Sequence, residues 1–209
     1  VHELKTAAYD LELFLDMAWN INSIQPSTIY DHQLRWLCRE FGQQAGERLL
    51  PVMQEFYRLT AIRKPEFMGW TQVELDKKKY QWGWSDVSDT EFSLTAFGGE
   101  LDRYLTDWRK VTDALEEIEK TLPENRHATF FSHVKYPVLS AAAMSRKMLE
   151  AQRARFIAKT KSGAGRWQRD EALLTACAKS QDAYQQIRNL TAYYNNELAD
   201  GKWQHLIVD

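Results

Sequence analysis

The sequence predicts an all-α fold, an antiparallel helical bundle of about five to six helices with one long aromatic-rich loop. Three observations predict it: apolar residues recur at steps of three and four, Pro and Gly signals separate the periodic segments, and residues 63–97 lack any period. We expect one helical domain over 1–209, with the loop 63–97 inside it. Because the chain starts without an initiator methionine, we expect it to be a piece of a larger protein.

The first helix is expected from about Glu3 to Trp19, and its residues are apolar on nearly all sides. A helix of this kind lies in the centre of a fold or is covered by a neighbouring domain. Glu12, Asp16 and Asn20 fall four residues apart and form one polar stripe on it. The stripe could hold an acid and base pair or contact a sugar. Ion pairs are the favoured interpretation, with the basic residues Arg35, Arg39, Arg63 and Lys64 as candidates.

Two shorter helices follow in the first half of the chain. One begins after the Pro-Ser-Thr signal at 26–28 and runs to Phe41. The next covers about 49–60, with Pro51 in its first turn or at a kink.

The second half is expected to be an antiparallel three-helix unit. Residues 99–122 form the clearest amphipathic helix, and Thr121 and Glu124 then have the spacing of a capping box. The helix that starts there continues to about 161, kinked at Tyr136 because Pro137 follows. The last helix covers 166–199 and ends at Asp-Gly.

The loop 63–97 carries the strongest candidates for binding. Trp70, Trp82 and Trp84 are candidate sugar-contacting or interdomain residues. If the stretch around Gly83 is extended, Trp82 and Trp84 point to the same side and could stack on sugar rings. Packing against the body of the domain or a neighbour is the favoured alternative.

Other classes of function find little support in the composition. A formal charge of −2 argues against nucleic acid as a partner, and no apolar run is long enough for a membrane span. Cys38 and Cys177 are too isolated for a disulfide framework or a metal motif. No cofactor, metal site or catalytic residue is expected. Three acidic residues of the loop are interpreted as solvated turn residues: Asp86, Asp89 and Glu91. The two histidines nearest in sequence, His127 and His133, are six residues apart on a helix and should point away from each other.

Three stretches together resemble one family: HELKTAAYDLELFLDMAWN at the start, RKPEFMGW at 63–70 and YYNNELADGKWQHL near the end, with KYPV at 135–138 between them. They are similar to the helical region that follows the catalytic barrel in glycoside hydrolase family 115, the xylan α-1,2-glucuronidases. The likeness runs over essentially the whole chain. It implies a multidomain parent enzyme whose catalytic carboxylates lie in the barrel, so none falls on a residue here.

The resemblance implies a non-catalytic scaffold domain that packs against the catalytic domain of the parent chain. The parent would remove glucuronic acid or its 4-O-methyl ether from xylan, and its polymeric substrate implies an extracytoplasmic, periplasmic or secreted, location. The fragment alone is expected to be inactive. Two alternatives remain: a carbohydrate-binding module that holds glucuronoxylan oligosaccharides on the Trp-Gly-Trp loop, and a free-standing helical interaction domain.

Overall fold

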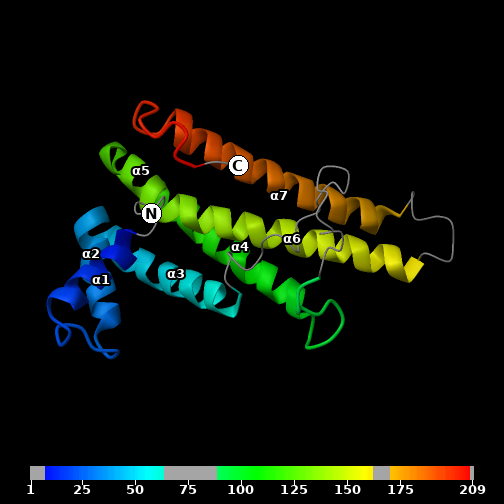
Figure 1. The fold of residues 1–209 in the computed structure, drawn as a ribbon, viewed down its shortest axis with the longest axis horizontal. Helices are drawn as coiled ribbons and strands as arrows, with labels where there is room; N and C mark the ends of the chain where they lie inside the picture. The colour runs from blue at the N-terminus through cyan, green and yellow to red at the C-terminus, as the bar shows by residue number, and fades with distance from the viewer. Residues whose placement is uncertain (1–7, 64–88, 162–169, 208–209) are drawn as a thin grey trace, which may run out of the picture. The chain divides into compact units, whose positions relative to one another are not determined.

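A computed structural model describes residues 8–63, 89–161 and 170–207. These residues contain helices and no strand, which confirms the all-α prediction. The elements are α1 (Ala8–Trp19), α2 (Ile29–Phe41), α3 (Gln43–Ile62), α4 (Glu100–Glu119), α5 (Glu124–Phe130), the π-helical η2 (Phe131–Lys135), α6 (Tyr136–Lys161) and α7 (Glu171–Asn196) (Figure 1). No helix in the described ranges has the length and apolar character needed to cross a membrane.

The chain divides into two compact units. The first unit consists of Val1–Arg58, Arg109–Ser140 and Leu190–Asp209, and the second of Leu59–Trp108 and Ala141–Asn189. The unit boundaries fall inside four helices, so that one part of each helix belongs to the first unit and the other part to the second: α3, α4, α6 and α7. The single domain over 1–209 therefore remains a prediction.

Aromatic side chains fill the core of the first unit. The Trp36 ring lies 5.4 Å from that of Tyr9 and 6.1 Å from that of Phe41, and Phe41 meets Phe130 edge-on at 5.7 Å. A second cluster is built from Phe131, Tyr194 and Leu198. The high aromatic content of the sequence is thus used in part for packing, where each ring buries a large apolar area.

The close approach of α2 and α3 depends on a glycine. A Cβ added at Gly46 would lie 2.6 Å from the backbone nitrogen of Cys38 and 2.7 Å from its Cα. Real Cβ atoms do not come so close to backbone, so only glycine fits here without movement of one helix. Gly42, at φ +88°, ends α2 and lets the chain enter α3 at once.

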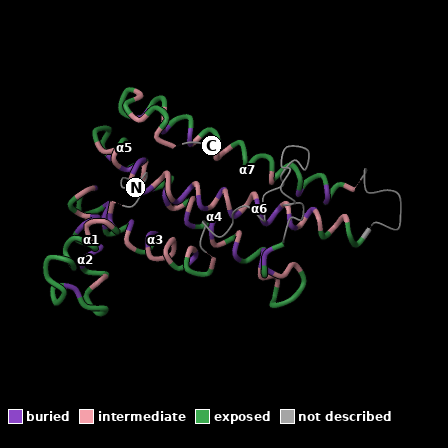
Figure 2. Tube along the Cα trace, viewed as in Figure 1, coloured by how far each residue is buried: buried purple, intermediate pink, exposed green. Residues whose placement is uncertain are grey.

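In the second unit α6 and α7 run antiparallel. The Ser180 hydroxyl donates a hydrogen bond to the Lys147 carbonyl at 2.9 Å, and further along α6 Ala154 packs with Leu173 and Ala176 (Figures 1 and 2). The antiparallel arrangement predicted for this half holds for these two helices.

A buried glutamine fixes the described end of the aromatic-rich loop. The Gln152 side chain accepts hydrogen bonds from the backbone N–H of Thr90 at 2.8 Å and from its hydroxyl at 2.6 Å. Its amide nitrogen donates to the carbonyls of Thr90 and Phe92. Phe92 then stacks on Tyr104 with ring centroids 4.5 Å apart. The hydrogen bonds of Gln152 and the stacking of Phe92 on Tyr104 thus fix this end of the loop against the helices.

Three local expectations were wrong. The third helix begins at Gln43 and not near Leu49, so Pro51 lies inside α3, which excludes the first-turn alternative and leaves the kink as a prediction. The capping box at 121–124 does not form: the N-cap of α5 is Pro123, and the Thr121 hydroxyl instead donates to the Ile118 carbonyl at the end of α4. The irregularity expected at Tyr136 lies at Phe131–Lys135, where the Tyr136 N–H bonds the Phe131 carbonyl. This wider turn comes just before Pro137, which has no N–H to give.

We predict that Gly46→Ala destabilises the chain by about 2 kcal/mol, the typical cost of forcing a carbon into a packed contact. Urea unfolding followed by circular dichroism measures it. Adding Cys38→Ala removes the sulfur contact and leaves the backbone contacts, so the double variant should stay destabilised relative to Cys38→Ala alone. An unchanged urea midpoint for Gly46→Ala would show that α2 and α3 can separate at no cost.

We also predict that Gln152→Leu costs at least about 2 kcal/mol, because several buried polar groups of Thr90 and Phe92 lose their partner. Gln185→Leu is the matched control, since Gln185 is an exposed glutamine of α7. Both variants are compared by thermal unfolding. Equal thermal midpoints for the two variants would contradict a stabilising role of the Gln152 hydrogen bonds.

Candidate functional site

The polar stripe of α1 faces α2. Glu12 forms a two-pronged ion pair with Arg39, with nitrogen to oxygen distances of 2.9 and 2.5 Å. This contact confirms the ion-pair interpretation of Glu12, with Arg39 as the partner among the candidates. Asn20, at the end of the stripe, accepts the backbone N–H of Asn22 and so stabilises the turn after the helix.

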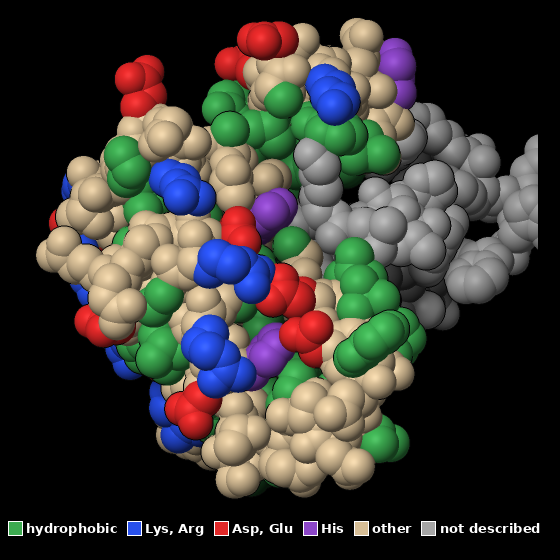
Figure 3. Space-filling model, turned by 90° about the vertical axis from the view of Figure 1, so that its left-hand side faces the viewer, with side chains coloured by type: hydrophobic (Ala, Val, Ile, Leu, Met, Phe, Trp, Pro, Cys, Tyr) green, Lys and Arg blue, Asp and Glu red, His purple; other side chains and the backbone are tan. Residues whose placement is uncertain are grey.

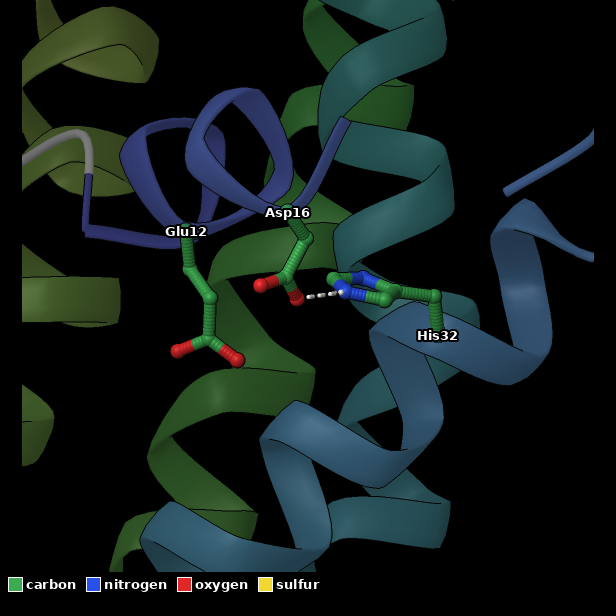
Figure 4. A group of neighbouring side chains, drawn as sticks. All are labelled: Glu12, Asp16 and His32. Carbon is green, nitrogen blue, oxygen red and sulfur yellow. Dashed lines mark hydrogen bonds and ion pairs between the residues drawn. The ribbon is translucent and has the colours of Figure 1, made fainter. Parts of the chain in front are cut away.

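Asp16 contacts a buried histidine that the sequence did not single out. Its Oδ2 lies 2.9 Å from Nε2 of His32, which comes from α2 (Figure 4). The imidazole is 7% exposed, whereas the Asp16 side chain is 53% exposed. The other ring nitrogen, Nδ1, lies 3.4 Å from the Tyr9 hydroxyl, and that hydroxyl donates to the Ile29 carbonyl. The imidazole thus lies between a buried phenol and an exposed carboxylate.

Charges on α1 and its surroundings shift several pKa values. Burial, reinforced by the negative charges of Asp10 and Glu12, raises the pKa of Tyr9 to about 12. The hydrogen bonds that Arg39 donates to the Glu12 carboxylate raise the pKa of Arg39. Burial raises the pKa of Tyr57, whose hydroxyl donates to Asp10 at 3.1 Å, and the Asp10 carboxylate raises it further. Both phenols therefore stay protonated in the folded chain at neutral pH.

Glu12, Asp16 and His32 make the one group of three possible metal ligands in the described parts of the chain. One donor atom of each lies within 4.8 Å of the others. Figure 4 shows both carboxylates pointing from α1 toward α2, with the imidazole meeting Asp16. His32 was missed because sequence spacing identifies ligands on one helix and carries no information about which residue of the next helix lies opposite. The spacing of Glu12 and Asp16, four residues apart on one helix face, was the one indication of this group in the sequence.

The second half of α1 and the turn after it are exposed and mostly apolar. Every residue from Phe14 to Ser23 is exposed, and Trp19 is exposed at 93% (Figure 2). Figure 3 shows a face of the molecule on which acidic, basic and histidine side chains lie together, with hydrophobic side chains beside them. We call the exposed large apolar residues of this segment the α1 apolar face: Phe14, Leu15, Met17, Trp19 and Ile21.

The second unit has an open groove of about 840 Å³ beside α6 and the start of α7. Two of its carboxylates share one basic partner: Arg153 binds Asp102 at 2.5 Å and Glu150 at 3.0 Å. Asp170 caps α7 through the Leu173 N–H. Four carboxylates and two basic side chains line the groove, an excess of negative charge that disfavours an anionic sugar: Asp102, Glu150, Asp170, Glu171, Arg153 and Lys179.

The residues predicted from the loop have different outcomes. Trp70, Trp82, Trp84 and Asp86 lie outside the described residues, so their roles remain predictions. Asp89 and Glu91 are exposed, in agreement with their interpretation as solvated residues, and both also form ion pairs, Asp89 with Arg155 at 2.7 Å and Glu91 with Arg63.

His127 and His133 contact different parts of the chain. His127 Nε2 lies 3.0 Å from the Leu122 carbonyl, and the His133 ring packs near Trp36 at 6.3 Å. Neither belongs to the group of possible metal ligands, in agreement with the expectation that they point apart.

We predict that stability falls as pH rises above about 10, where tyrosine ionises in the unfolded chain. Because the pKa of Tyr57 is raised in the folded chain, the unfolded chain then binds fewer protons than the folded one, and unfolding becomes easier. Tyr57→Phe should flatten this decline, measured as urea midpoints between pH 9 and 11. Tyr30→Phe, at an exposed tyrosine, should leave the decline unchanged. A Tyr57→Phe profile that matches the original chain would contradict the assignment.

Comparison with known proteins relates the N-terminal part of the chain to a glycoside hydrolase family. The family model described as Glycosyl hydrolase family 115 matches residues 1–67, which include α1, α2 and α3. No curated protein matches the chain. The match covers the segment that carries the Glu12, Asp16 and His32 group and the α1 apolar face. Over this N-terminal part, the resemblance to glycoside hydrolase family 115 is confirmed.

Proposed function

We propose that the chain is a non-catalytic helical scaffold domain of a glycoside hydrolase that removes glucuronic acid or 4-O-methylglucuronic acid side chains from xylan. Its partner is the catalytic domain of the parent chain, and the α1 apolar face is the surface that packs against it. The family match over residues 1–67 supports the link to a glycoside hydrolase. An extracytoplasmic location, where xylan is degraded, belongs to the same proposal.

The single observation that carries the proposal is the orientation of α1. Its polar stripe contacts α2 through Glu12 and Asp16, and its large apolar residues from Phe14 to Trp19 face solvent. Apolar side chains gathered on one exposed face mark an interaction surface, whereas single exposed apolar residues are ordinary. Tyr30 of α2 is also a large exposed side chain, at 58%. A neighbouring domain that covers this face would complete the burial that the sequence of α1 requires.

The charged groups support a scaffold more than an active site. Inverting glycosidases need one carboxylic acid and one carboxylate on opposite sides of the sugar. In the described groove, Asp102 and Glu150 both bind Arg153, and Asp170 caps a helix. On α1, Glu12 binds Arg39. Each of these carboxylates already has a structural partner.

We predict that Leu15→Gln combined with Trp19→Gln leaves the thermal midpoint nearly unchanged, because both side chains are more than half exposed. The double variant should lower the fluorescence of an apolar dye about twofold or more. It should also weaken binding to a family 115 catalytic domain expressed without its helical region by about tenfold or more. Leu174→Gln, at an exposed leucine of α7 in the second unit, is the matched control.

The same samples test the other functions. The chain is incubated with glucuronoxylan oligosaccharides, and both the heat of binding and released glucuronic acid are measured. Release of glucuronic acid by the chain alone would overturn the non-catalytic role. Saturable heat without release would favour the carbohydrate-binding alternative, with Trp82→Ala and Trp84→Ala as its variants. Binding to the catalytic domain that is unaffected by the α1 double variant would place the contact elsewhere.

A further inference from the structure

We propose that Glu12, Asp16 and His32 bind one divalent transition-metal ion of the Zn²⁺ class between α1 and α2. This inference goes beyond the scaffold function and does not depend on it. The donors are two carboxylates and one imidazole, a set that suits borderline metals such as Zn²⁺ better than Mg²⁺ or Ca²⁺, which prefer oxygen ligands alone.

The backbone already gathers the three donors. Glu12 and Asp16 are one helical turn apart on α1 and point the same way, and His32 comes from the facing helix (Figure 4). Ligands about 2.0–2.2 Å from a tetrahedral zinc ion lie about 3–3.6 Å from one another. The Asp16 and His32 donors are 2.9 Å apart, and the whole group lies within 4.8 Å. To complete the site, Glu12 would release one of its two bonds to Arg39 and rotate toward Asp16, and the Asp16 and His32 donors would move slightly apart.

The contact of His32 with Tyr9, outside the group, is of the kind that orients a metal-binding histidine. The Tyr9 hydroxyl donates its proton to the Ile29 carbonyl, so its oxygen is available to accept a proton from His32 Nδ1. A neutral imidazole protonated at Nδ1 has a lone pair on Nε2, and that lone pair faces Asp16 Oδ2 at 2.9 Å. A proton on Nε2 donated to Asp16 and a metal ion shared by the two atoms both fit this contact, so titration with Zn²⁺ has to distinguish them. Histidine ligands of metals characteristically donate their other ring N–H to such a partner.

The surrounding charges leave room for a divalent ion. Glu12, Asp16 and Glu40 are acidic, and Arg39 is the basic side chain bonded to two of them. Glu12 can give one oxygen to the metal while Arg39 keeps the other, which makes Arg39 an outer hydrogen-bond partner that orients the ligand. The exposed Asp16 carboxylate provides the route from solvent. A bound ion would join α1 to α2 and so fix the helix that carries the α1 apolar face.

The test uses calorimetric titration and thermal unfolding of the 209-residue chain with ZnCl₂, and with CaCl₂ and MgCl₂ for comparison. We expect binding of one Zn²⁺ per chain, a thermal midpoint that rises with free Zn²⁺ and returns with chelator, and little response to Ca²⁺ or Mg²⁺. Asp16→Asn keeps a hydrogen-bond acceptor for His32 but is a poor metal ligand, so the affinity should fall at least about tenfold. Glu12→Gln should weaken binding in the same direction.

Asp182→Asn, at an exposed carboxylate of α7 in the second unit, is the matched control and should bind Zn²⁺ unchanged. His32→Asn tests the buried ligand, and its folding is checked by circular dichroism before titration. If it does not fold, the two carboxylate variants decide the question. No heat with Zn²⁺, or equal affinity in Asp16→Asn, Glu12→Gln and the original chain, would overturn the proposal. In that case a proton, not a metal ion, joins Asp16 to His32.

Discussion

The contact between the polar stripe of α1 and α2 decides how the N-terminal part of the chain is organised. Glu12 binds Arg39 and Asp16 binds His32, and both acids lie on one side of a helix that is otherwise largely apolar. Because this side faces α2, the apolar residues from Phe14 onward face outward. Both the surface proposed for the partner domain and the proposed metal site are consequences of this one orientation.

The helices could be predicted from the sequence because burial imposes a period of 3.6 residues on each of them. The residues at the buried steps of α4 show this directly, since Leu101, Trp108 and Leu115 are all almost fully buried. The helix ends were predicted less well. Thr121 illustrates the reason: a hydroxyl can cap the helix before it or the one after it, and the fold, not the local spacing, selected the carbonyl of Ile118.

The site was predictable only in part, for a physical reason that also applies to Gln152. Spacing along one helix places Glu12 and Asp16 on one face and suggests a basic partner, and Arg39 was among the candidates. Which side chains of another helix lie opposite is decided by packing, here by the close approach at Gly46 and by the aromatic contacts of Trp36. His32 and Gln152 are buried polar residues whose partners lie 16 and 62 positions away, beyond any local pattern.

The energies involved explain why α1 would depend on a partner. An ion pair that is partly open to solvent, such as Glu12 with Arg39, contributes about 0–1 kcal/mol. Burying a side chain such as Phe14 or Leu15 against another domain contributes about 1.5–3 kcal/mol. On its inner side α1 also packs the buried Tyr9 ring on Trp36, with ring centroids 5.4 Å apart, so the ion pair is only one part of what holds the helix. In the proposed arrangement, α2 holds α1 in place and the catalytic domain adds the burial of its outer face, which is the behaviour expected of an interdomain element.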